Sequence, residues 1–196
     1  MEVNVENGYI ALRHTLSRAP NGWLAWGIRT LTESYWNHGG QIVVINGIVF
    51  VIEAQASGVV MTPIAEFIDS KKYDIKIVRV REDSFASRKE YKKAIEHSTI
   101  FLQSKIGAKY DRGAIVWLAI YCIFAGLLKS VKVNPFHNRK KFFCFELICQ
   151  AWHGTSSIIS HLFAGTHHPE AECSVITGKD IGKAVSVEYV AGKDVK

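Results

Sequence analysis

The chain has 196 residues, of which 48% are hydrophobic and 11% aromatic, so it can bury a hydrophobic core of ordinary size. This composition excludes an intrinsically disordered chain, and 4 prolines and 15 glycines without a short period exclude a collagen-like or low-complexity chain. Lys and Arg number 24 against 18 Asp and Glu, which gives a net charge of +6. We expect a single globular domain over residues 1–196.

The basic excess is concentrated in the middle of the chain. Residues 71–141 hold 17 Lys and Arg against 6 Asp and Glu, a local charge of +11, whereas the rest of the chain carries −5. Such an asymmetry indicates a positive face that suits phosphates, an acidic partner or an anionic membrane surface, although ordinary solvated helix faces give the same pattern. Aromatic residues do not alternate with the basic ones, so no specific nucleic-acid partner is expected.

The cysteines and the N-terminus bear on the cellular compartment. Cys122, Cys144, Cys149 and Cys173 are the four cysteines, and the N-terminus has no basic region followed by an apolar one. Without a secretory signal we expect a reducing, cytoplasmic location. The cysteines are then predicted to be buried thiols or reactive groups rather than disulfides.

The predicted elements, in chain order, are a strand, a helix, a β-hairpin, a helix, a strand, three helices and two final strands. The hairpin has the strongest signal, because residues 41–45 and 48–54 are rich in β-branched residues and flank Asn46-Gly47, which suits a type I′ turn. Thr62-Pro63 predicts a helix start, with Thr62 as the N-cap. Alternation over 74–80 predicts a half-buried strand.

Later segments complete the pattern. Apolar residues recur at helical spacing over 91–106 and stop at Gly107, which predicts an amphipathic helix with a glycine C-cap. The 16 uncharged residues 113–128 span about 24 Å as a helix, short of the ~30 Å hydrocarbon core, so a buried helix is expected and a lipid-contacting one is the alternative. A helix is predicted over 142–152 and strands over 173–176 and 184–190. Separate runs of strands and helices favour an α+β fold, an antiparallel sheet packed against helices.

The predicted hairpin brings a histidine close to a carboxylate. If Ile45 faces Ile48, Gly40 faces Glu53, and His38 becomes the diagonal neighbour of Glu53 on the same face of the sheet. A carboxylate at that distance can orient an imidazole and stabilise its charged form. Gln55, opposite His38, is the alternative partner, and a bulge at the two glycines before Gln41 would change the register.

A histidine oriented in this way suits a cysteine nucleophile, and Cys144 is the candidate. It stands in the sequence KFFCFEL at the predicted first turn of a helix, where unpaired backbone N–H groups and the helix dipole stabilise a thiolate. The alternative is that Cys144 is a buried small hydrophobe. Spacing alone leaves both interpretations open.

The ordered set of motifs resembles a known family, the circularly permuted branch of the NlpC-type papain-like cysteine hydrolases. This is the YiiX-like group, related to the lecithin-retinol acyltransferases, in which the histidine strand precedes the cysteine helix. The resemblance extends from about Gly8 to Ile181 and is carried by residues 28–32, 36–44, 51–54, 58–60, 62–63, 107–111, 143–147 and 176–181.

The resemblance implies a circularly permuted papain-like fold with Cys144 as nucleophile, His38 as general base and Glu53 as the third member of a triad. It places Tyr110 near the oxyanion or substrate. The implied activity is that of a thiol peptidase, amidase or acyl hydrolase acting on a peptide, a cell-wall amide or a lipid acyl group, with no cofactor or metal. Two departures from the family pattern are Tyr9, in place of aspartate, and Phe145, in place of a small serine, which implies an altered acyl pocket.

Three alternatives remain open. A metal site would draw on His153, His161, His167, His168 and Cys173, although no established zinc-ligand spacing is present. His137 is a rival base because it is close to Cys144 in sequence. The non-enzymatic alternative is a catalytically degenerate papain-like module that binds an acidic partner or associates peripherally with an anionic membrane through the basic middle of the chain.

Overall fold

The fold is α+β, built on an antiparallel six-stranded sheet in the order β4-β3-β2-β1-β5-β8. The computed structural model describes residues 5–15, 35–69, 73–113, 140–153 and 155, together with the backbone of 185–191. The sheet strands are β1 (Ile10–Thr15), β2 (His38–Ile45), β3 (Ile48–Gln55), β4 (Gly58–Pro63), β5 (Tyr73–Val80) and β8 (Val185–Ala191). The helices are α2 (Ile64–Phe67), the 3-10 turn η1 (Glu82–Ser84), α3 (Arg88–Lys105) and α5 (Cys144–Trp152), and β6 (Lys109–Tyr110) pairs in parallel with β7 (Lys141–Phe142).

The β2–β3 hairpin has the register predicted from its turn. Asn46 and Gly47 take positive φ values of 51° and 77°, as a type I′ turn requires. Ile45 pairs with Ile48 and Gly40 with Glu53, and the pairing shows no shift between these two positions. The hairpin therefore presents the side chains of His38 and Glu53 on one face, as predicted.

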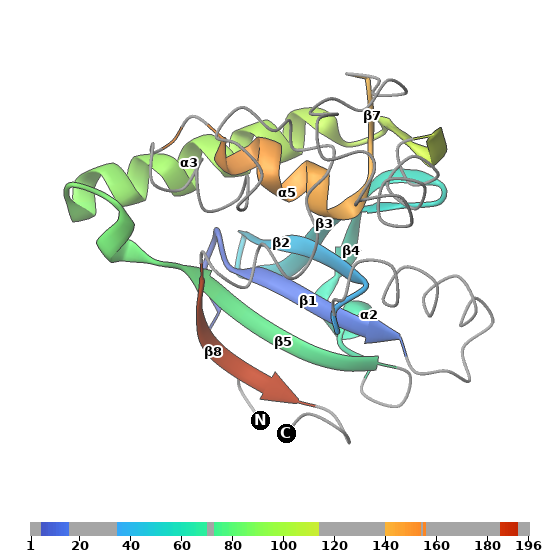
Figure 1. Ribbon diagram of the computed structural model, residues 1–196, viewed down its shortest axis with the longest axis horizontal. Helices are drawn as coiled ribbons and strands as arrows, with labels where there is room; N and C mark the ends of the chain where they lie inside the picture. Colours follow the sequence, from blue (N-terminus) through green and yellow to red (C-terminus); the bar gives the residue numbers. More distant parts are fainter. Residues whose placement is uncertain are drawn as a thin grey trace, which may run out of the picture.

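Helices α3 and α5 lie together on one face of the sheet (Figure 1), and α5 contacts β2 and β3. This face is filled by the main core cluster, in which Leu12, Ile52 and Trp152 are almost completely buried. The short helix α2 packs with β3 and β4, and its Phe67 joins a second buried cluster on the opposite face. Burial of apolar side chains on both faces explains why the central strands are apolar on both sides.

A buried polar contact ties the helical layer to the sheet. Gln41 of β2 is fully buried, donates from Nε2 to Ser98 Oγ of α3 at 3.0 Å, and accepts from Trp152 Nε1 of α5 at 2.8 Å. Because a buried amide without partners is costly, this arrangement favours one relative position of β2, α3 and α5.

Some sequence predictions need correction. Thr62 and Pro63 belong to β4, and α2 begins only at Ile64, because Thr62 pairs with Val51 across the sheet and its hydroxyl is used elsewhere. The prediction that no cysteine forms a disulfide is wrong for Cys149, which is disulfide-bonded. The predicted helix over 113–128, after Gly113, and the strand over 173–176 lie outside the described residues. Among the described helices, none combines the length and apolar character needed to cross a membrane.

Candidate active site

The candidate site lies where β2 begins and β3 ends, and its centre is a contact between His38 and Glu53. The Nε2 atom of His38 forms a hydrogen bond with Oε2 of Glu53. The Glu53 side chain is fully buried, whereas 13% of the His38 side chain is exposed. The hairpin register brings the two residues together, since Glu53 pairs directly with Gly40, two positions along the strand from His38.

The second oxygen of Glu53 is held by two further side chains. Oε1 accepts hydrogen bonds from Thr62 Oγ1 at 2.6 Å and from Gln55 Nε2 at 2.7 Å. Gln55 therefore binds the carboxylate rather than the imidazole, which settles the alternative left open by the sequence. Thr62 was missed as part of the site because its position before a proline indicated a helix cap. Only the β3–β4 pairing, which places Thr62 opposite Val51, shows that it is the diagonal neighbour of Glu53 on the same face.

Cys144 is the first residue of α5, at the helix N-terminus where backbone N–H groups lack helical partners. The thiol is free, and 5% of the residue is exposed. Glu146 accepts a hydrogen bond from the Phe143 backbone N–H at 3.3 Å, and the Leu147 N–H donates to the Phe143 carbonyl at 3.0 Å, so the first turn is firmly closed around Cys144.

His38 joins the two parts of the site, because the side chain of Cys144 is its other hydrogen-bond partner. Burial alone would lower the pKa of His38, but the hydrogen bonds to Cys144 and Glu53 outweigh it and raise the pKa from 6.5 to about 8. For Glu53, burial acts to raise the pKa, and the contacts with His38, Thr62 and Arg13 overcome this and lower it to about 2. The arrangement thus favours a protonated imidazole next to an ionised carboxylate.

Tyr110 lies near this cluster, on β6, where it pairs with Phe142 of β7 two residues before Cys144. The pKa of Tyr110 lies far above its usual value, mainly because the side chain is buried and in addition because Cys144 and Asp111 are near. Its hydroxyl therefore stays protonated and can act as a hydrogen-bond donor beside the thiol.

Phe145, one of the two departures from the family pattern, follows Cys144 directly and packs against the sheet. Its side chain belongs to the main core cluster, and its ring packs over Gly39 of β2. A Cβ atom added to Gly39 would lie 3.2 Å from Phe145 Cε1 and 3.3 Å from Ile148 Cδ1, so the glycine makes room for this helix face. Tyr9, the other departure, is partly buried against the second cluster on the opposite face of the sheet.

The described residues give no support to the alternative metal site or to His137 as the base. His153, the residue after α5, is exposed, whereas His137, His161, His167, His168 and Cys173 lie outside the described residues. In the parts of the chain that the structure describes, no three or more His, Cys, Asp or Glu residues gather in a way that could hold a metal ion.

Comparison with known proteins finds similarity in structure but not in sequence. No protein-family model and no curated protein matches the sequence. A crystal structure described as metalloprotein yiiX from Escherichia coli O157:H7, DUF1105, superposes with a TM-score of 0.60 at 13% identity, over 96% of this chain and 98% of the other. The two chains share a fold. At this identity the likeness supports the predicted YiiX-like architecture at the level of the fold and carries no activity with it.

Proposed function

We propose that the protein is a cysteine hydrolase with a circularly permuted papain-like site, in which Cys144, His38 and Glu53 form the catalytic triad. The observation that carries the proposal is the position of His38, shared between a buried carboxylate and a free thiol at a helix N-terminus. A merely structural cysteine has no need of a charged imidazole oriented by an acid. The His38 strand precedes the Cys144 helix in the chain, which is the order of the permuted branch.

The proposed reaction is acyl transfer to the thiol and then to water. Because Nε2 of His38 is held by Glu53, Nδ1 is the nitrogen that takes the Cys144 proton, and the thiolate attacks the substrate carbonyl. The backbone N–H of Cys144 and the Tyr110 hydroxyl stabilise the oxyanion. His38 then gives the proton to the leaving amine or alkoxide, and water, deprotonated by His38, releases the acid and restores the thiol. The substrate class is a peptide or cell-wall amide or a lipid acyl group.

The first test is the pH-dependent rate at which iodoacetamide alkylates Cys144, read by peptide mass spectrometry. We expect fast modification of Cys144 below about pH 7 in the native protein, and loss of the advantage in His38→Ala. Equal rates at Cys144 and at the same residue in the unfolded chain would refute the proposed site. A positive result would justify screening acyl-amide and lipid-ester probes.

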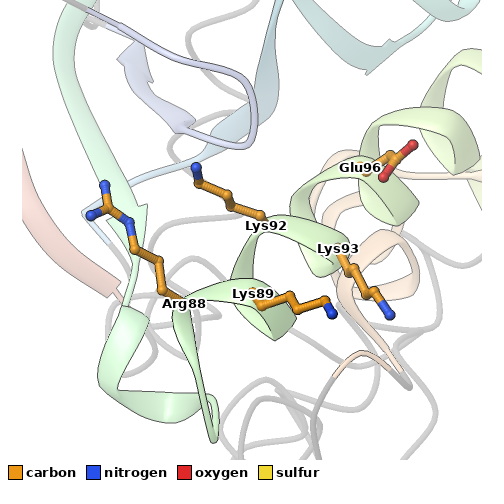
Figure 2. Close-up of a pocket in the computed structure, with 5 residues that line it drawn as sticks. All are labelled: Arg88, Lys89, Lys92, Lys93 and Glu96. Atoms are coloured by element: carbon orange, nitrogen blue, oxygen red, sulfur yellow. The ribbon is translucent and has the colours of Figure 1, made fainter.

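A second candidate function is peripheral binding to an anionic surface, and a cluster of basic residues on α3 favours it. Arg88, Lys89, Lys92, Lys93 and Glu96 line a hollow of about 410 Å³ on this helix. Figure 2 shows the four basic side chains spreading to both sides of the first turns of α3 rather than converging, which suits a charged plane better than a single small anion. No carboxylate within the described residues forms an ion pair with any of the three lysines.

This second candidate is tested with vesicles. Binding to vesicles containing phosphatidylserine, absent with pure phosphatidylcholine, should weaken steeply as salt rises. We expect it to persist in Cys144→Ala and to be lost when Lys89, Lys92 and Lys93 are changed to glutamate. Binding that ignores either salt or the charge reversal would exclude the basic cluster as the docking surface.

A further inference from the structure

Arg13 lies beside the candidate site and is not a member of the proposed triad. It is directly opposite His38 in the β1–β2 pairing, so the two side chains leave the sheet as neighbours. Its Nη2 atom lies 3.8 Å from Glu53 Oε2, the same oxygen that binds His38. Only 16% of the Arg13 side chain is exposed.

Two aromatic rings fix the Arg13 guanidinium in this position. Its Cζ atom lies 4.3 Å from the ring centre of Tyr73 on β5 and 4.8 Å from that of Phe67 on α2. Stacking of this kind holds a planar cation without using its hydrogen bonds. The Nε atom of Arg13 is buried and has no hydrogen-bond partner among the described residues. An arginine kept in place at the cost of an unsatisfied donor has been positioned for its charge rather than for a hydrogen-bond network.

We propose that Arg13 is a positioning residue of the candidate site, acting on His38 through its fixed positive charge rather than through contact with substrate. This inference rests on the proposed function for its purpose, but the electrostatic effect itself is measurable whether or not the protein is an enzyme.

The charges around His38 show why one more cation matters. Glu53 on β3 and Cys144 on α5 both favour the charged imidazole, whereas Arg13 on β1 opposes it. From α2, the uncharged ring of Phe67 approaches His38, with the two ring centres 6.1 Å apart. Among the described residues, Arg13 is therefore the cation that lowers the pKa of His38 against the effect of Cys144 and Glu53.

The consequence is kinetic. In the proposed reaction His38 must release its proton to the leaving group and then accept one from water, which is most efficient when its pKa lies close to the working pH. Burial and Arg13 lower the pKa of His38, and the contacts with Cys144 and Glu53 raise it, to about 8 overall. Without the cation the ring would remain protonated to higher pH. Glu53 would keep its place, because Thr62 and Gln55 hold its other oxygen.

The test is the titration of the His38 ring by NMR in the full chain, with its signals assigned by comparison with His38→Gln. In Arg13→Met and Arg13→Gln, which remove the charge, we expect the midpoint to rise by about half a pH unit or more. Arg13→Lys keeps the charge, so the midpoint of His38 in this variant should lie within about 0.2 pH units of the wild-type midpoint. Arg81→Met, which removes an exposed arginine paired with Asp83 far from β2, is the matched control.

The outcomes separate this inference from the proposed function. A midpoint that is unchanged or falls in both uncharged variants, in chains that retain native spectra, would overturn the role of Arg13. Arg13→Gln keeps a polar, though shorter, side chain and guards against a folding failure of Arg13→Met. If Cys144 of the wild type alkylates no faster than an unfolded thiol, the hydrolase proposal fails, and the titration still decides the role of Arg13.

Discussion

Replacing Glu53 by glutamine tests the triad with the smallest change of shape. Oε1 of Glu53 accepts from Thr62 and Gln55, and the amide oxygen of the new side chain can keep both hydrogen bonds. The amide NH₂ then occupies the place of Oε2 and donates to His38 Nε2. The ring proton is forced onto Nδ1, the nitrogen that accepts the proton of Cys144 in the proposed reaction.

The size of the effect follows from the electrostatics of His38. Burial opposes protonation, and the Cys144 and Glu53 contacts more than offset it, so the pKa rises from 6.5 to about 8, which is worth about 2 kcal/mol. The whole net shift corresponds to a factor of about 30 in the protonation equilibrium of His38. Glu53→Gln removes one of the two contacts that raise this pKa, so it should shift the equilibrium by a factor of about this order. Because the wrong tautomer also blocks proton transfer, turnover of an acyl substrate should fall further, by about 10⁴-fold as in serine triads with the same acid-to-amide change.

The assay is alkylation of Cys144 between pH 5 and 9 in the wild type and in Glu53→Gln. Asp83→Asn, an acid-to-amide change at an exposed position, is the matched control and should follow the wild-type curve. Unfolding curves confirm that the variants are native. If folded Glu53→Gln kept the wild-type rate below pH 7, the carboxylate would have no part in activating the thiol, and the reasoning from the hairpin to the triad would be refuted.

Three other predictions concern stability. The His38 pKa of about 8 lies above 6.5 and that of Glu53, about 2, lies below 4.5, so their contribution is complete between pH 4.5 and 6.5. In urea titrations, the free energy of unfolding should fall by about 2 kcal/mol as the pH rises past 8, and should fall again as the pH drops toward 2. His38→Gln should abolish the decline at alkaline pH. Gly40→Ala should cost about 1–3 kcal/mol, because its Cβ would lie 2.7 Å from a carbonyl oxygen of β3, and a variant of wild-type stability would contradict the register. Gln41→Leu should cost about 1–3 kcal/mol by leaving the Trp152 indole N–H without an acceptor, measurable by denaturant unfolding, and a neutral result would show that another group can replace it.

The parts of the fold predicted from sequence are those set by local rules. Asn46-Gly47 determines the turn and with it the pairing of Gly40 with Glu53, because a two-residue loop leaves no freedom of register. The helix over α3 and the helix beginning at Cys144 follow from apolar spacing and from glycine or aromatic boundaries.

The parts that sequence could not supply depend on pairing between distant segments. Thr62 has the local chemistry of a helix cap, and only its place in β4 shows that it binds the acid of the site. Arg13 lies 40 residues from Glu53 along the chain, and nothing near it in sequence indicates the contact. The disulfide at Cys149 was missed for a similar reason, since pairing of cysteines is a property of the folded chain.

The sequence separations of the site contacts imply an order of assembly. His38 and Glu53 are 15 residues apart within one hairpin, so their contact closes a short loop and can form early. Cys144 arrives only when α5 docks, a step secured by the Gln41–Trp152 contact across 111 residues. A partly folded or truncated chain would therefore hold an oriented imidazole and acid but no thiol beside them.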